Sequence, residues 1–315
     1  MTFLHEDKEF EPLIRIVAAE RHLTEGIVEK DYWVTHSLWA LRRTGLAIAF
    51  KGGTALSKGF GIIERFSEDV DLTIGRGSRS DLPGLGSLTS STVSATQKRR
   101  AFFEALAPSI PGMTEVKLLP PDDDRWISVE YEVYYPKRFT LPQGIRPFVR
   151  LEPGLRPWKP PTVSRDLTSF LHEYVAAVGL LGSYTDNRAS AIECVHPFVT
   201  LIDKLESVVK RYARERFAPE EFIRHYEDLA HLILRIDQLP ALTAEEKRDV
   251  VAQCLGEREI RPDDAALVLG DPRRRVQLES AYSDIAPMFW GERVPLRTCC
   301  ERIAGWLNEN PLGTS

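Results

Sequence analysis

Residues 50–75 read FKGGTALSKGFGIIERFSEDVDLTIG, and the order of features in this stretch predicts the architecture of the chain. An apolar run at 46–50 leads into it and has the length of a strand. Gly52 and Gly53 come next, and without a Cβ atom they let the backbone turn sharply and let a ligand approach the amides. We therefore expect a strand, a glycine turn, a short helix, a loop and a second strand.

The helix is expected to start at Thr54, a good N-cap residue, and to run through Phe60 to Ile63, with its first N–H groups free to bind a phosphate. From Asp69 the pattern alternates strictly, so Asp69 and Asp71 share one face of the second strand, about 6.6 Å apart. Two such carboxylates can reach one pair of divalent cations. An Asp-x-Asp pair alone is more often a solvated strand edge, and the glycine turn before it is what favours a metal site.

This arrangement resembles the polymerase-β-like nucleotidyltransferase superfamily. A longer set of motifs, EKDYWV at 29–34, KGGTALS at 51–57 and RFSEDVDL at 65–72, resembles specifically the AbiEii/AbiGii toxin family. These are nucleotidyltransferase toxins of type IV toxin–antitoxin systems, and the MenT toxins are their relatives.

Two stretches in the second half of the chain extend the resemblance. DKL at 203–205 and RHYEDL at 224–229 resemble the second pair of motifs in the family, whose lysine and aspartate belong to the active site. Without the resemblance, Lys204 and Asp228 would be interpreted as surface charges. His225 stands where many relatives have an aspartate.

The resemblance implies transfer of a nucleoside monophosphate from an NTP to an acceptor, with Mg²⁺ or Mn²⁺ as the cofactor. A strand-end glutamate, Glu152, is the first choice for a third metal ligand beside Asp69 and Asp71, and Glu132 is the alternative. Arg211 lies seven residues after Lys204, about 10.5 Å along the predicted helix and on nearly the same face. The candidate catalytic residues are Asp69, Asp71, Lys204 and Asp228, and the candidate nucleotide-binding residues are Gly52, Gly53, Thr54, Ser57, Lys204 and Arg211.

The expected fold class is α/β. A nucleotidyltransferase lobe with a mixed or antiparallel sheet and N-terminal helices at 8–21 and 25–43 should occupy residues 1–160. Residues 161–315 should form a mostly helical lobe that contributes Lys204 and Asp228 to a cleft between the two. Four prolines between 153 and 161 favour a boundary there.

Asp31 falls inside the apolar stripe of the predicted helix 25–43 and therefore needs a partner. A structural ion pair, or hydrogen bonds from backbone amides, is expected more than a catalytic role. The EKD sequence is nevertheless part of the family signature, which places some role for Asp31 near the site.

The amino-acid composition limits the location of the protein and the ways in which it could bind RNA. The 315 residues are 43% hydrophobic, have a net charge of −5, and show neither a long apolar run nor an N-terminal signal pattern, so a cytoplasmic protein outside the membrane is expected. Because the net charge gives no general attraction to nucleic acid, RNA binding would rest on the basic runs at 98–100, 210–216 and 273–275. Arg76 and Arg79, in a Gly- and Ser-rich insertion at 75–96, are more readily interpreted as solvated.

The resemblance further implies a toxin that blocks the 3′ ends of tRNA, is neutralised by a cognate antitoxin, acts in phage defence, and is inactivated by phosphorylation of Ser67. Two alternatives remain open. One is an enzyme that transfers the nucleotide to protein, and the other is a non-catalytic RNA- or antitoxin-binding module on the same scaffold. The intact set of four candidate catalytic residues favours catalysis.

Overall fold

The structure is a computed structural model that describes residues 1–67, 69–75, 82–106, 110–121, 123–156 and 158–312. Arg76 and Arg79 lie outside these residues. The chain divides into two compact units. Met1–Gly59, Glu68–Lys159 and Ser164–Cys194 form the sheet unit, and Phe60–Ser67, Pro160–Val163 and Val195–Ser315 form the helical unit.

Within the described residues the strands form one seven-stranded mixed sheet in the order β3-β4-β5-β2-β1-β7-β6. Strand β2 pairs antiparallel with β1 and parallel with β5, and β1 pairs parallel with β7. The expected α/β class with a mixed sheet is therefore confirmed. The strands are β1 Ile48–Lys51, β2 Asp69–Ile74, β3 Glu115–Leu119, β4 Glu130–Tyr134, β5 Val149–Leu155, β6 Thr162–Leu167 and β7 Ala189–Val195.

Strands β6 and β7 lie beyond residue 160, where the sequence pattern predicted mostly helices. Strand β6 ends the sheet and is largely open to solvent, so its residues carry no apolar alternation to recognise. Strand β7 is interrupted by Ala191, which has a φ of 50° and breaks the regular inside–outside order of its side chains. The prediction was wrong for these two elements because both lack the period-two pattern.

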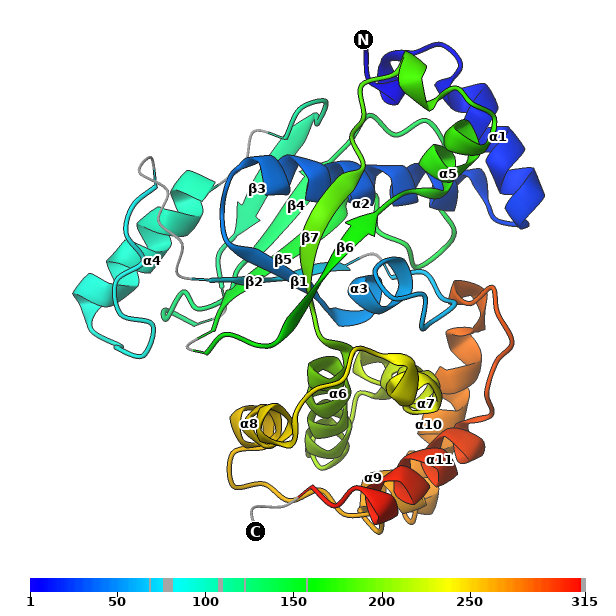
Figure 1. Ribbon diagram of the computed structural model, residues 1–315. Coiled ribbons are helices and arrows are strands. Elements are labelled where there is room, and N and C mark those ends of the chain that lie inside the picture. The colour runs from blue at the N-terminus through cyan, green and yellow to red at the C-terminus, as the bar shows by residue number, and fades with distance from the viewer. Residues whose placement is uncertain (68, 76–81, 107–109, 122, 157, 313–315) are drawn as a thin grey trace. The chain divides into compact units, whose positions relative to one another are not determined.

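The two N-terminal helices of the sheet unit lie close to the ranges predicted for them, 8–21 and 25–43. The long helix α2 crosses one face of the sheet (Figure 1), and most of its side chains are buried. Helix α3 differs from its prediction. Its N-cap is Lys51, it ends at Lys58, and Phe60 and Ile63 lie beyond it. Thr54 is inside the helix because its hydroxyl donates to the Asp69 carbonyl instead of capping. The helices are η1 Leu4–Glu6, α1 Phe10–Arg21, α2 Glu25–Arg43, α3 Gly52–Lys58, α4 Val93–Leu106, α5 Phe170–Ala177 and η2 Leu181–Ser183.

A buried polar network joins the N-terminal helices of the sheet unit to α5 and the chain after it. Asn187 is its centre, because its side chain bonds Tyr32, His36 and His172 at 2.8–2.9 Å. His5 bonds the same Tyr32 hydroxyl at 2.8 Å. Burial lowers the pKa of both His5 and His172 to about 4, so these rings are neutral at physiological pH.

The helical unit is built around α6, α7 and α11, which pack on one another, with α8 beside α6. The mostly helical structure predicted after residue 160 is found from Pro197 onward, and Thr243 caps α8 through a capping box. Helix α10 ends at Asp284, before a 3₁₀ turn. The helices are α6 Pro197–Tyr212, η3 Pro219–Glu221, α7 Arg224–Arg235, η4 Ile236–Gln238, α8 Ala244–Leu255, α9 Ala265–Val268, α10 Pro272–Asp284, η5 Ala286–Met288 and α11 Leu296–Glu309.

The segment between α3 and β2 belongs to the helical unit. Ile62, Ile63 and Phe66 are buried there. Backbone bonds from Phe66 to Met288, and from Trp290 to Glu64, hold the segment in place. The apolar residues that had suggested a continued α3 are thus core residues of the helical unit.

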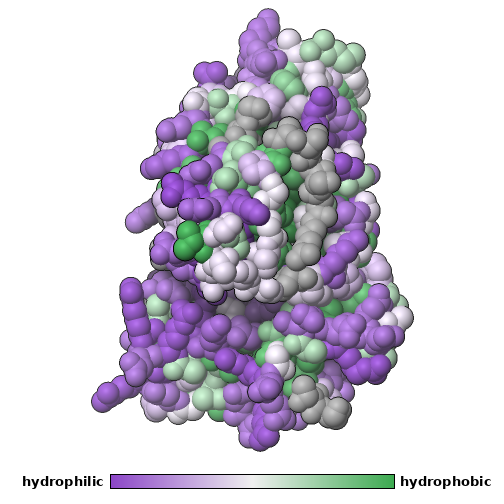
Figure 2. Space-filling model, turned by 90° about the vertical axis from the view of Figure 1, so that its left-hand side faces the viewer, coloured by the Kyte–Doolittle hydropathy of each residue, from purple (hydrophilic) through white to green (hydrophobic). Residues whose placement is uncertain are grey.

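Hydrophilic residues cover most of the face shown in Figure 2, with smaller apolar groups among them. None of the helices among the described residues is long and apolar enough to cross a membrane.

Candidate active site

The two aspartates of β2 lie on the same face of the strand, as the alternation predicted. Asp69 and Asp71 are half-buried, while Val70 and Leu72 are buried on the other face. Asp71 is opposite Lys51 on β1 and opposite Glu152 on β5. One carboxylate therefore sits between a lysine and a glutamate from the two neighbouring strands.

Basic side chains and a glycine surround these carboxylates closely. The Arg146 guanidinium donates to Asp69 Oδ1 at 3.0 Å, and Lys51 Nζ lies 3.6 Å from Asp71 Oδ1. Gly52 has a φ of +76°, and a Cβ placed on it would lie 2.0 Å from Asp71 Oδ2. Glycine is thus required at 52 both by its backbone conformation and by the approach of the Asp71 carboxylate.

Glu152 is coupled electrostatically to the pair. Burial, followed by the negative charges of Asp71 and Asp69, raises its pKa to about 7, while Arg150 at 3.3 Å opposes the shift. Glu132 lies one strand farther along, opposite Arg150, and accepts a hydrogen bond from Tyr134. The register therefore supports Glu152 over Glu132 as the third carboxylate.

The donor set suits a hard divalent cation. Side chains of His, Cys, Asp and Glu, within the part of the chain that the structure describes, form no ready cluster of three around one point. Asp71 and Glu152 are nevertheless paired across β2 and β5, Asp69 lies on the same face of β2 as Asp71, and after burial the charges of both aspartates raise the pKa of Glu152. A divalent cation relieves such repulsion, and carboxylate oxygens are the ligands that Mg²⁺ accepts.

The hydroxyl groups proposed for nucleotide binding are both used within α3 and β2. Thr54 is 1% exposed, and its hydroxyl donates to the Asp69 carbonyl at 2.6 Å. Ser57 is half-buried and donates to the Thr54 carbonyl at 3.2 Å. Thr54 therefore fixes the start of β2 against α3, directly beside the first aspartate.

The EKD sequence of α2 contacts segments of the chain next to the candidate site. Asp31 is paired with Lys58 at 2.5 Å and accepts the Phe170 amide at 2.8 Å, which confirms the structural role expected for it. Lys30 donates to the carbonyl of Arg146, the residue that contacts Asp69. The motif thus positions the loop that carries Arg146.

In the helical unit, Lys204 and Asp228 form one buried cluster with a residue that the sequence analysis missed. Asp228 is fully buried and receives both Nε and Nη2 of Arg65, at 2.7 and 2.8 Å. Lys204 Nζ donates to the same carboxylate at 2.8 Å and lies 3.1 Å from His225 Nδ1. Arg65 stands in the RFSEDVDL motif, but only the fold shows that it belongs with Asp228.

The charges in this cluster determine its protonation. Burial alone would raise the pKa of Asp228, but Arg65 and Lys204 hold it far below its usual range. Burial, then the positive charge of Lys204, lowers the pKa of His225 well below its ordinary value. The neutral His225 ring can accept a hydrogen bond from Lys204 Nζ, and both Lys204 and Arg65 contact the Asp228 carboxylate.

Arg211 is placed differently from this cluster. Its guanidinium donates to the Glu221 carbonyl at 2.7 Å and lies 3.7 Å from the Glu221 carboxylate. The structure therefore brings together Gly52, Asp69, Asp71 and Glu152 in one unit, and Lys204, Asp228 and Arg65 in the other. A role for Arg211 in nucleotide binding stays a prediction.

A mixed α/β fold with a glycine turn before a strand Asp-x-Asp is the arrangement expected of a nucleotidyltransferase. The family model described as "Nucleotidyl transferase AbiEii toxin, Type IV TA system" matches residues 39–298, and the chain belongs to this family. The match includes every candidate site residue, whereas EKDYWV at 29–34 precedes it.

Other comparisons add little to this assignment. Comparison with the curated proteins gave no match. Among solved structures, JHP933 from Helicobacter pylori is similar at 14% sequence identity and a TM-score of 0.42, covering 88% of this chain and 89% of that one.

Proposed function

We propose that this protein transfers a nucleoside monophosphate from an NTP to the 3′ end of tRNA, and thereby inhibits translation and growth. The proposal rests on the position of Asp71, which lies opposite Glu152 on β5 and close to the backbone of Gly52. Membership of a nucleotidyltransferase toxin family supports the same chemistry. In this proposal residues 1–160 act as a polymerase-β-like lobe, and residues 161–315 supply Lys204 and Asp228.

Asp69, Asp71 and Glu152 would hold Mg²⁺ or Mn²⁺, which when bound polarises the attacking oxygen and neutralises charge on the leaving pyrophosphate. Lys51 and Arg146 orient the two β2 carboxylates through their contacts with them. The backbone at Gly52 and Gly53, with Thr54 and Ser57 behind it, would receive the triphosphate.

Lys204 would neutralise phosphate charge as a point cation. Asp228 fixes the position of the Lys204 ammonium, and Arg65 in turn fixes Asp228 through two hydrogen bonds. His225 occupies the remaining side of the ammonium as a neutral acceptor. In this proposal Arg65 is a positioning residue, and Arg211 is a further cation for the nucleotide.

One observation favours protein as the alternative acceptor. Arg99 is buried and donates to the carbonyls of Arg125 and Ser87, and Arg274 donates to the carbonyls of Tyr212 and Arg214. The sequence-based assignment of Arg99 to an RNA-binding patch was wrong because this side chain is buried, whereas Arg274 is partly exposed and its assignment stays a prediction. Fewer cations are thus available for RNA than the sequence suggested.

The test is to incubate the purified protein with each labelled NTP, Mg²⁺ and either total RNA or total protein, with Asp71→Asn as the control. Label in a tRNA-sized band that depends on Asp71 is expected. Label in a protein band alone would replace the tRNA assignment and leave the transfer chemistry standing, and label in neither would refute nucleotidyl transfer. Growth inhibition relieved by a co-expressed antitoxin would support the role as a toxin.

A further inference from the structure

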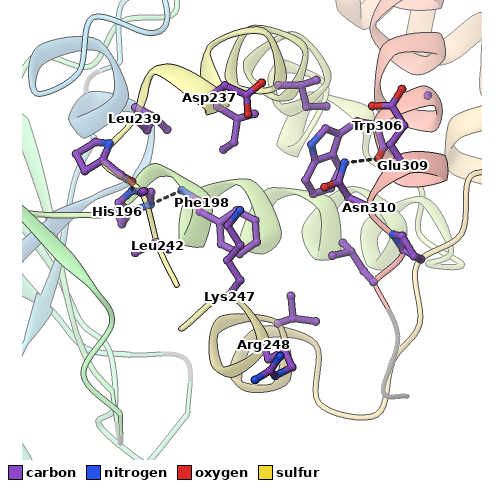
Figure 3. A pocket seen from close by; sticks show the side chains of 18 of the residues that line it. His196, Phe198, Asp237, Leu239, Leu242, Lys247, Arg248, Trp306, Glu309 and Asn310 are labelled. Atoms are coloured by element: carbon purple, nitrogen blue, oxygen red, sulfur yellow. Dashed lines mark hydrogen bonds between the residues drawn. The ribbon is translucent and has the colours of Figure 1, made fainter. Parts of the chain in front are cut away.

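A groove of about 1140 Å³ lies within the helical unit, between α6, η4 with the loop after it, α8 and α11 (Figure 3). Phe198 and Trp306 are buried beside it, and five partly exposed apolar side chains converge on it. These five are Ile233, Ile236, Leu239, Leu242 and Val251. Single exposed apolar residues are common, but a concave group around an aromatic pair is typical of a binding surface.

Two acidic and two basic residues lie on opposite sides of the groove, while Arg302, which also lines it, donates to the Ala230 carbonyl at 3.2 Å. Figure 3 shows Asp237 and Glu309 along its upper side and Lys247 and Arg248 along its lower side. None of these four forms an ion pair with another residue in the described parts of the chain. These four residues give the groove an acidic rim and a basic rim, and on the basic rim the Lys247 ammonium lies 5.9 Å over the Phe198 ring.

We propose that this groove binds an amphipathic helix of a partner protein. The apolar face of that helix would pack against the five partly exposed apolar side chains around Phe198 and Trp306, its acidic edge would face Lys247 and Arg248, and its basic edge would face Asp237. Recognition of an amphipathic helix in an apolar groove is a recurring mode of protein association, and tryptophan is the residue type most enriched in the centres of such interfaces.

The size and charge of the groove favour a helix over a small molecule or RNA. A helix about 10 Å in diameter would fill the volume over roughly ten residues, or three turns. The volume exceeds the roughly 300–1,000 Å³ of ordinary small-molecule pockets. RNA is disfavoured because the acidic rim would repel its phosphates. The inference does not depend on nucleotidyl transfer, since none of these residues belongs to the candidate active site.

Two substitutions of Gly305 test whether the groove binds a helix. It lines the cavity in α11, and a Cβ added to it would meet no atom within 4 Å. Gly305→Trp should therefore fill the groove without disturbing the fold. Gly305→Ala is the matched control, because it leaves the groove open and improves helix propensity by roughly 1 kcal/mol.

The probes are three labelled helical peptides of about 14 residues with the same leucine face. One has a glutamate edge and a lysine edge, one has glutamates on both edges, and one has lysines on both. Binding to the full-length protein is measured by fluorescence anisotropy. The mixed peptide should bind best, Gly305→Trp should abolish its binding, and Gly305→Ala should not.

Lys247→Glu/Arg248→Glu makes both rims acidic and should shift the preference to the all-lysine peptide by roughly tenfold. Lys210→Glu/Arg297→Glu, which changes the net charge equally outside the groove, should leave the order of the peptides unchanged. The proposal fails if a proline-containing mixed peptide binds equally well, if a single-stranded RNA displaces the peptide, or if the rim substitutions do not alter the preference. Nucleotidyl transfer by Gly305→Trp should equal that of wild type, so the two proposals can fail separately.

Discussion

Replacement of Gly52 by alanine should separate the chemistry of the site from the stability of the fold. A Cβ at this position would lie 2.0 Å from Asp71 Oδ2, whereas such contacts are not found below 3.0 Å. The carboxylate must therefore move by at least about 1 Å. Asp71 Cγ and Cβ would also lie close to the added Cβ, at 2.8 and 3.2 Å, so the whole side chain must turn aside, and a displacement of about 1 Å in a catalytic group can lower the rate by roughly 10²-fold.

The backbone strain of the substitution can be measured separately with Gly45. Gly45 has a φ of +73°, nearly that of Gly52, but a Cβ there would meet nothing within 4 Å. Alanine in this conformation costs roughly 1–2 kcal/mol at either position. Gly45→Ala and Gly52→Ala should therefore lower the Tm by similar amounts, a few degrees for a chain of this size.

The assay compares transfer of labelled nucleotide by the two variants below their Tm values. Gly52→Ala should lose roughly 10²-fold in rate, and Gly45→Ala should retain wild-type activity. Equal losses in both would attribute the effect to strain. A folded Gly52→Ala with full activity would show that the position of the Asp71 carboxylate does not matter, and the proposed metal site would then be wrong.

Asp69→Asn and Asp71→Asn should each lower nucleotide transfer by several orders of magnitude while circular dichroism stays unchanged, and near wild-type transfer by either would exclude it from the site. Arg65→Ala should lower the free energy of unfolding by about 3 kcal/mol, since it leaves Asp228 buried with one cation fewer, and urea unfolding will measure this against Arg65→Lys. The pKa of His172 is about 4, below its unfolded value of 6.5, so its contribution of up to about 3 kcal/mol is present above pH 6.5 and lost as the pH falls through 4. His172→Gln should flatten that part of the stability curve in urea unfolding, and an unchanged curve would assign acid sensitivity elsewhere.

The sequence was most informative where a local pattern determines the local structure. The alternation after Asp69 predicted β2 and its polar face, and the stripe from Ile27 to Leu41 predicted α2. It was least informative where tertiary contacts decide. Thr54 is a good N-cap residue by type, yet its hydroxyl donates a hydrogen bond to the Asp69 carbonyl, and helix α3 begins two residues earlier, at Gly52.

The same limit explains why Arg65 was missed. Its motif position shows that an arginine precedes the Asp-x-Asp strand, but its partner lies 163 residues later, in α7. No spacing rule connects residues so far apart in sequence. What the sequence does contain is a chemical requirement, since a carboxylate such as Asp228 on a helix with a strong apolar stripe must find a cation if the fold buries it.

Burial also changes how the basic runs must be interpreted. At 98–100 and at 273–275 the middle arginine is tied to backbone carbonyls, and only its neighbours remain exposed. Replacing a whole run would therefore remove a structural arginine together with the exposed cations, and a loss of RNA modification could not be assigned to phosphate contacts. Substitution of the exposed residues alone, with Arg99 and Arg274 retained, isolates the electrostatic contribution, which should appear as a smaller dependence of RNA binding on salt.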